Sequence, residues 1–342
     1  GDDIPKQLEQ LRDVLETRPA AVVVAPVDTT AIAAVLDERL DEDPDGDGRD
    51  VSIIAYDELI LDSDRVDYFA TFDHRETGRL QAKALLDGLG MADPGAGPFA
   101  IELLAGSGDD PSAQEAFAGA MEVLRPLIDS GRLAVPSGRT TLEQAAILRG
   151  SPATAADRVA ELLEDGVELH GILSPSDAMS AAVAQVLADA GLGVVEAGTR
   201  WTPVPVAPET PDVTPAPTGP PPPDATTPPN EDGAPDAATD ADEGGAADEA
   251  EKAPVPTVVL TGGGSTLDGV RAVVDGAQTA TVYEDPRGLA RAVASMVSEV
   301  VAGAAPTVTR GATTDNGVRE VPTLLLEPQL VATVEDAARL LG

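Results

Sequence analysis

The sequence contains no cysteine, which excludes disulfide bonds, thiolate catalysis and cysteine-ligated zinc. Aromatic residues make up only 2% of its 342 residues, so alanine, valine and leucine must fill the core. Basic residues are also scarce: 22 lysines and arginines stand against 60 acids, and the net charge is −38. Because phosphate and anionic lipid would be repelled, we expect neither a nucleic acid nor a membrane surface as a partner.

Long apolar runs are also absent, since none approaches the roughly 18–20 residues of a membrane span. The chain opens on GDDIPKQLEQL, in which aspartate shortly before proline is typical of a helix start. Because the sequence opens on a helix and not on a signal peptide, we expect that the protein has an earlier segment that is missing from the printed sequence.

Residues 202–256 differ in composition from the rest of the chain. They hold 15 of the 30 prolines, with twelve acids against one lysine, and show no apolar periodicity. Such a segment cannot bury enough apolar surface to offset the entropy lost on ordering, so we predict a disordered, acidic, proline-rich insertion. It is either a solvated spacer or a Thr/Pro-rich segment that is glycosylated or binds a partner.

Patterns typical of strands and helices alternate along the remainder. Near-continuous Val/Ile/Leu strands in repeated strand–helix units predict an α/β fold with parallel sheets covered by helices. The predicted strands lie at residues 20–26, 51–57, 67–72, 99–106, 132–135, 170–175, 257–263 and 279–283, with two short ones near 318–326. The predicted helices lie at residues 4–17, 29–40, 75–89, 112–129, 153–165, 177–190, 266–275 and 287–302.

The carboxyl ends of the predicted strands are where we expect a ligand, as is usual in parallel sheets. They fall at residues 26–28, 57–58, 106–110, 174–177 and 262–264. Asp57 and Glu58 are either exposed strand-end charges or ligand contacts. Neighbouring side chains on a strand point to opposite faces, so both line one pocket only if the strand ends before them. This alternation argues against an acid–base catalytic pair.

Two further strand ends also allow capping roles. SAQE (112–115) fits a capping box, so Ser112 is either a helix cap or a ligand contact. Asp177 is expected to cap or support the helix at 177–190.

Three other motifs favour structural roles. Within DEDPDGDGRD (41–50), the residues from Asp43 onward match the first half of a calcium-binding EF-hand loop. The twelfth position, counted from Asp43, falls on Ile54, where a glutamate is required. It is either an acidic surface loop or an irregular calcium site. GGGSTLDG (262–269) lacks the closing glycine and the lysine of nucleotide-binding loops. The two histidines lie far apart and no serine occupies a nucleophile elbow, so we expect no metal, no cofactor and no enzymatic activity.

These strand ends, in this order, resemble the periplasmic sugar-binding proteins of the xylose-binding and multiple-sugar-binding group. The resemblance rests above all on IIAYDELI with DYFATFD (53–60 and 67–73) and on NGVREVPTLLLEP (316–328). It covers nearly everything except the insertion and roughly residues 136–152. It implies a two-lobed type 1 periplasmic-binding-protein fold whose first N-terminal strand is absent from the printed sequence.

The resemblance also implies the division into lobes and the function. One lobe would comprise residues 1–72 and 265–281, and the other residues 75–201, 257–262 and 282–342, with chain crossings near 72–74, 262–265 and 281–285. The protein would be the extracytoplasmic, lipid-anchored, monomeric solute-binding component of an ABC-type uptake system. It would close a hinge on a monosaccharide or related polyol and dock on a membrane permease.

Several positions match the residues that bind sugar in that group. Asp57 corresponds to its sugar-binding aspartate, whose oxygens would accept hydrogen bonds from two neighbouring hydroxyls. Glu58 stands where the group carries arginine. Asp110 corresponds to the aspartate of a D-N-N-A turn, and Ser112 replaces the second asparagine of that turn.

Other positions depart from the group's pattern. Ser176 replaces the asparagine of an S-N-D-A strand end, Gly264 replaces the aspartate of S-G-Q-D, and Glu284 replaces a basic residue. No tryptophan occupies residues 137–145, where the group has a stacking ring. These departures leave one alternative, a homologue that has lost sugar binding and acts as a sensor or interaction module. A LacI-type repressor effector domain shares the fold but would need a helix-turn-helix segment upstream.

Overall fold

The computed structural model describes residues 3–40, 51–203 and 255–342. The described residues up to 202 and from 256 onward form one compact unit. The predicted calcium-binding alternative at 41–50, and all but the ends of the predicted insertion at 202–256, lie outside the described residues. Among the described residues, no helix combines the length and apolarity that a membrane crossing requires.

A five-stranded sheet is built from both ends of the chain. Its order is β1-β2-β3-β11-β10, in which the first four strands are parallel and β10 is antiparallel to β11. The strands are β1 (Ala21–Val24), β2 (Ser52–Tyr56), β3 (Tyr68–Phe72), β11 (Glu320–Leu326) and β10 (Thr313–Asp315).

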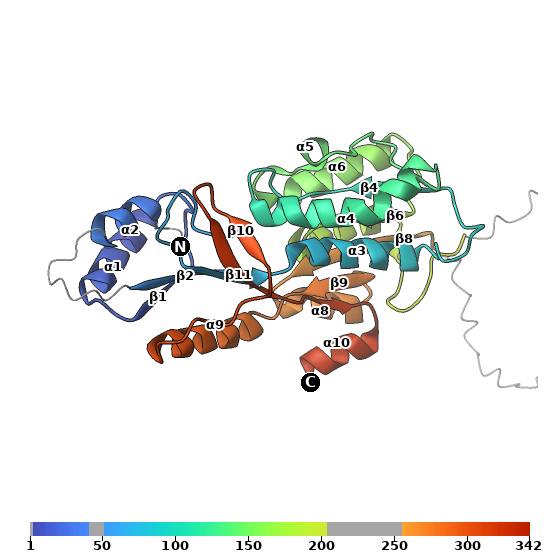
Figure 1. The fold of residues 1–342 in the computed structure, drawn as a ribbon. Helices are drawn as coiled ribbons and strands as arrows, with labels where there is room; N and C mark the ends of the chain where they lie inside the picture. Colours follow the sequence, from blue (N-terminus) through green and yellow to red (C-terminus); the bar gives the residue numbers. More distant parts are fainter. Residues whose placement is uncertain (1–2, 41–50, 204–254) are drawn as a thin grey trace, which may run out of the picture. The chain divides into compact units, whose positions relative to one another are not determined.

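Both faces of this sheet are covered by helices (Figure 1). Ile53 and Ile54 are adjacent on β2 and fully buried, and they belong to two different apolar clusters because neighbouring strand residues face opposite ways. The Ile53 cluster includes residues of α1 (Ile4–Glu16) and α2 (Ala33–Leu40), whereas the Ile54 cluster includes residues of α9 (Pro286–Val301).

A seven-stranded sheet forms from strands within residues 99–283 and the late strand β12, in the order β12-β9-β8-β6-β4-β5 with β7 also paired to β8. All its pairs are parallel except that of β12 with β9. The strands are β4 (Phe99–Leu103), β5 (Leu133–Ala134), β6 (Gly171–Leu173), β7 (Gly193–Val194), β8 (Thr257–Gly264), β9 (Ala280–Tyr283) and β12 (Gln329–Val331). The predicted α/β class with helix-covered parallel sheets is thereby confirmed.

Two helix pairs pack on opposite faces of the second sheet. Val259 of β8 lies in one apolar cluster with α3 (His74–Gly88) and α4 (Pro111–Asp129). Its neighbour Leu260 lies in another with α6 (Pro152–Glu164) and α7 (Asp177–Asp189). The buried strands are therefore apolar on both faces, which is why their sequences read as continuous apolar runs.

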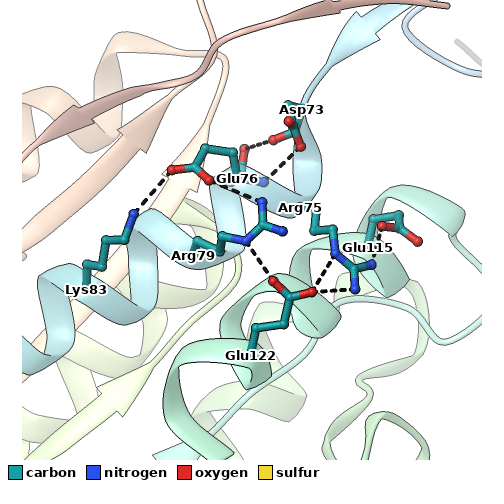
Figure 2. Close-up of polar contacts among 8 residues, drawn as sticks. Asp73, Arg75, Glu76, Arg79, Lys83, Glu115 and Glu122 are labelled. Carbon is teal, nitrogen blue, oxygen red and sulfur yellow. Dashed lines mark hydrogen bonds and ion pairs between the residues drawn. The ribbon is translucent and has the colours of Figure 1, made fainter. Parts of the chain in front are cut away.

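Helices α3 and α4 approach closely where each carries a glycine. A Cβ atom on Gly78 would collide with the backbone of Ala116, and one on Gly119 would collide with the backbone of Arg75. This approach brings charged side chains of the two helices together (Figure 2). Arg75 and Arg79 both donate to Glu122, at Nε–oxygen distances of 2.8 and 2.7 Å.

The strand pairing divides the C-terminal third differently from the predicted lobes. We expected residues 265–281 beside the first sheet, but β8, α8 (Leu267–Val274) and β9 form a strand–helix–strand unit of the second, because β9 pairs in parallel with β8. Conversely, α9, β10 and β11 belong to the first sheet, although we placed 282–342 in the other lobe. The chain therefore passes between the sheets at 72–74, at about 283–286 and at about 326–329, whereas we expected crossings near 72–74, 262–265 and 281–285.

Several short elements were not predicted. They are α5 (Leu142–Ala145), the 3-10 turn η1 (Leu148–Gly150), β7, β12 and α10 (Val334–Leu341). The last has a recognisable start, since the side chain of Thr333 accepts a hydrogen bond from the Asp336 N–H at 3.1 Å.

Candidate ligand-binding site

Two adjoining cavities lie at the carboxyl ends of strands from both sheets. The smaller has a volume of about 250 Å³ and the larger about 500 Å³, and His74, Ser112 and Glu284 line both. The six predicted site residues all line one or both cavities. Asp57 and Glu58 line the smaller, Asp110, Ser176 and Gly264 line the larger, and Ser112 lines both.

Asp57 and Glu58 both reach the smaller cavity because β2 ends one residue before them. Asp57 adopts a left-handed backbone conformation with φ of 67°, which aspartate tolerates better than most residues. Its N–H donates to the Ala70 carbonyl at 2.8 Å, and the Glu58 N–H donates to the Tyr56 carbonyl at 2.7 Å. The strand alternation that would have separated the two carboxylates is broken at this turn.

Asp110 and Ser112 occupy the first turn of α4. The cap of this helix is Asp110, whose Oδ1 accepts from the Ser112 N–H at 2.8 Å, and Pro111 is the first helical residue. The predicted capping role of Ser112 is therefore wrong, because the helix begins two residues earlier than that motif requires. Ser112 stands inside the first turn, where its side chain lines both cavities.

At the start of α7 the cap is Ser176 and not Asp177. The Ser176 Oγ accepts from the Met179 N–H at 3.3 Å, so its own hydroxyl proton remains available to a ligand. Asp177 instead supports the fold, accepting from Gln278 Nε2 at 2.8 Å and from Thr281 Oγ1 at 2.7 Å. Gly264 offers only its backbone to the larger cavity.

His74, the first residue of α3, connects the two sheets at the site. Its Nδ1 lies 3.3 Å from Oε1 of Glu284, which follows β9, and that same oxygen accepts from Thr77 Oγ1 at 2.7 Å. Its Nε2 lies 3.1 Å from Thr71 Oγ1, which donates its only proton to the Asp57 carbonyl at 2.9 Å. With that proton used and a carboxylate on the other side, both ring nitrogens are placed to donate, which favours the charged imidazolium.

The pKa values of the site follow from this crowding of charge. Burial of the His74 ring opposes its charge, but the hydrogen bond and charge of Glu284, with Asp57 and Glu58, outweigh burial and raise its pKa. Asp57 is accessible to water, yet desolvation by the surrounding protein raises its pKa, an effect that His74 opposes. Desolvation and the charges of Asp110 and Asp57 raise the pKa of Glu58 to about 7.

The charged lining residues His74, Glu284 and Arg149 were not among the predicted site residues. His74 and Glu284 come together from positions about two hundred residues apart, so no local motif indicates the pair. Arg149 lines the larger cavity from η1 in a left-handed conformation, with φ of 55°. Its only local signal is the following glycine, which is typical of a turn.

Aromatic side chains contribute little to the larger cavity. Tyr56 and Phe72 line the smaller one, where β2 and β3 end. Tyr283 is only 3% exposed and packs in an apolar cluster. Trp201 packs edge-on against Phe99 and His170, with ring centroids 5.4 and 4.9 Å away.

The carboxylates of the site do not form a metal centre in the part of the chain that the structure describes, where no group of three or more acidic or histidine side chains could hold a metal ion. The arrangement is that of a polar cavity able to accept several hydrogen bonds. Such concave sites with a few placed polar groups are typical of small-molecule binding.

Residues 1–201 match the periplasmic binding protein domain family. The chain belongs to this family. It is 34% identical over 333 residues to the multiple sugar-binding periplasmic receptor ChvE of Rhizobium radiobacter, covering 96% of this chain and 75% of that protein. It is 33% identical over 330 residues to the multiple sugar-binding periplasmic protein SbpA of Azospirillum brasilense, covering 96% and 74%.

The fold is also shared with solved structures of solute-binding proteins. An ABC transporter solute-binding protein of Clostridium phytofermentans with bound β-D-glucose superimposes with a TM-score of 0.69 at 24% identity, covering 99% of this chain and 84% of that one. At this identity the likeness shows the fold alone. The predicted type 1 periplasmic-binding-protein fold is therefore confirmed.

Proposed function

We propose that the protein is the extracytoplasmic solute-binding component of an ABC-type uptake system and binds a monosaccharide or related polyol. The observation that carries the proposal is the convergence of six predicted site residues on two adjoining cavities. The relatives named as sugar-binding support the choice of ligand class. Asp57 and Asp110 serve as acceptors of ligand hydroxyl protons, and Ser112 and Ser176 can donate or accept.

Binding closes a hinge. The two sheets with their helices are the lobes, and the crossings near 72–74, 283–286 and 326–329 are where the backbone bends. Ligand that contacts Asp57 and Glu58 beside the first sheet and Asp110 and Ser176 beside the second favours the closed state, because only that state makes both sets of contacts.

The closed, monomeric form then docks on the membrane permease of the transporter. The same proposal places the protein outside the cytoplasm, held to the membrane by a lipid anchor, and assigns it no catalytic step. Support for this location comes from the periplasmic relatives.

Isothermal titration calorimetry of the full chain tests the proposal with a panel of pentoses, hexoses, polyols, amino sugars and sugar acids. Saturable binding of at least one member, weakened by Asp57→Asn, is expected. Asparagine is chosen because it tolerates the left-handed backbone of Asp57. If no member of the panel binds at millimolar concentration, the transport function is wrong and the sensor or interaction module takes its place.

A further inference from the structure

The charges that line the two cavities are strongly unbalanced. Four carboxylates line them, from Asp57, Glu58, Asp110 and Glu284, and they face the side chains of His74 and Arg149. The positive charge of His74 is held by Glu284 at 3.3 Å. This leaves three of the four carboxylates without a close ion pair from a residue that the structure describes.

Arg149 does not restore the balance at Asp57 and Glu58. It lines only the larger cavity, whereas those two acids line only the smaller one. The charges that act on Glu58 are those of Asp110, Asp57 and His74.

Asp57 and Glu58 are the least satisfied of the four acids. No described residue donates a hydrogen bond to either carboxylate, although both lie at a cavity that combines two aromatic walls with polar groups. Glu284 already accepts from Thr77, and Asp110 accepts from the backbone of its own helix. Two neighbouring carboxylates repel each other, and the half-buried Glu58 is also partly desolvated, so a ligand that supplies a cation relieves the repulsion.

The missing cation is better supplied by an organic ligand than by a metal ion. Among residues 3–40, 51–203 and 255–342, no group of side chains converges closely enough to ligate a metal. An ammonium group instead carries three donors and tolerates acceptors at hydrogen-bond distance in several directions. The smaller cavity, at about 250 Å³, has space for a substituent of that size.

We propose that the ligand is a small polyol that carries a protonated amine, such as an amino sugar, with its ammonium group between the carboxylates of Asp57 and Glu58. The proposal rests on the proposed function and names the ligand class of the same site. The hydroxyl groups of such a ligand are left to Asp110, Ser112 and Ser176 in and beside the larger cavity. A neutral sugar leaves the excess negative charge in place, and a sugar acid adds to it.

A matched charge series tests the proposal by titration calorimetry of the full chain near neutral pH. The probes 6-amino-6-deoxy-D-glucose, D-glucose and D-glucuronate differ only in the group at carbon 6, which is an ammonium, a hydroxyl or a carboxylate. D-glucosamine places the amine elsewhere on the ring. We expect at least one amine to bind about tenfold more tightly than glucose, and glucuronate to bind more weakly, since hydrogen bonds to charged groups are roughly twice as strong as neutral ones. N-acetyl-D-glucosamine, whose nitrogen is uncharged, should bind no more tightly than D-glucose.

The outcomes separate this proposal from the proposed function. Neutral sugars that bind as tightly as both amines overturn the amine assignment and leave the sugar-binding function standing. Failure of every probe and of the whole sugar panel overturns both.

Two variants locate the effect. Glu58→Gln should remove most of the preference for amine over glucose, whereas Glu143→Gln, which changes an exposed acid outside both cavities, should leave it intact. A preference that survives Glu58→Gln, or that falls equally in Glu143→Gln, contradicts the assignment, because the attraction would then come from the overall charge.

Discussion

Helix α3 takes part in two charged clusters. In one the numbers of acids and bases are equal, and in the other the acids are in excess. Along its length Arg75, Arg79 and Lys83 meet an equal number of glutamates, two of which lie on α4 (Figure 2). At its first residue, His74 meets Glu284 beside a cavity in which three further carboxylates have no ion-pair partner among the described residues. The two clusters begin within one residue of each other along the chain.

The difference shows how to separate charges that serve the fold from charges that serve a ligand. The exposed cluster pairs each acid with a base and joins two helices, so none of its charges is left without a partner for a ligand to neutralise. In the cavity, acids crowd together where water is partly excluded, and the pKa of Glu58 is raised to about 7 as a result. An unpaired group of this kind is typical of a functional site.

Reversing the charge at Glu58 should have the largest effect. Glu58→Arg removes an attraction for the ligand amine and adds a repulsion. The lost attraction and the added repulsion should each cost about tenfold, so we expect affinity for 6-amino-6-deoxy-D-glucose to fall about 100-fold. Glucuronate should become the preferred member of the series. Unchanged preference in calorimetry would show that the cavity charge does not select the ligand.

Removing one carboxylate without reversing charge should have a smaller effect. Asp57→Asn keeps the left-handed turn and the cavity shape but loses a charged acceptor, so all ligands should bind about tenfold more weakly. Glu143→Gln is the matched control and should bind normally. Equal affinities for Asp57→Asn and wild type would remove Asp57 from the site.

Acidification should weaken the binding of an amine several-fold. Since the pKa of Glu58 is raised to about 7, lowering the pH from about 8 to about 6 neutralises that carboxylate in the free protein. The amine of 6-amino-6-deoxy-D-glucose stays protonated over this range, as alkyl amines do. His74, Asp57, Asp110 and Glu284 also face the cavity, and the raised pKa of His74 keeps it charged as the pH falls.

The Glu58→Gln variant separates these contributions, because glutamine at this position cannot titrate. Its affinity for the amine should be low and nearly constant with pH. A pH dependence that persists in Glu58→Gln would assign it to His74 or to another carboxylate.

The smallest effect is expected in the balanced cluster. Glu122→Gln weakens the contacts of both Arg75 and Arg79, and the unfolding midpoint should fall by about 1–2 °C at low salt and less at high salt. Sugar affinity should not change. A loss of ligand affinity in this variant would show that the two clusters are coupled.

Much of the fold and of the site was predictable because local patterns determine them. Apolar runs such as that of β2 identify buried strands, and the rule that ligands bind at their carboxyl ends selected Asp57, Asp110 and Ser176. The partners in the His74–Glu284 pair could not be predicted, because their contact depends on two chain crossings and not on spacing.

The remaining errors have similar physical causes. A single left-handed residue at Asp57 turns Glu58 into the cavity, and strand alternation gives no indication of it. The sheet to which a C-terminal segment belongs depends on which strands pair, so α8 and β11 were placed with the other sheet, and the expected boundary at 281/282 fell inside β9. Helix α10 was not predicted, although Thr333 carries the signal of a helix start.

A crystal structure of the full chain with 6-amino-6-deoxy-D-glucose, or with D-glucosamine if that binds more tightly, tests the central claim most directly. The account predicts one sugar in the two adjoining cavities, with its amine nitrogen about 3 Å from carboxylate oxygens of both Asp57 and Glu58. A sugar whose amine points away from these carboxylates, or one bound elsewhere on the protein, would contradict it.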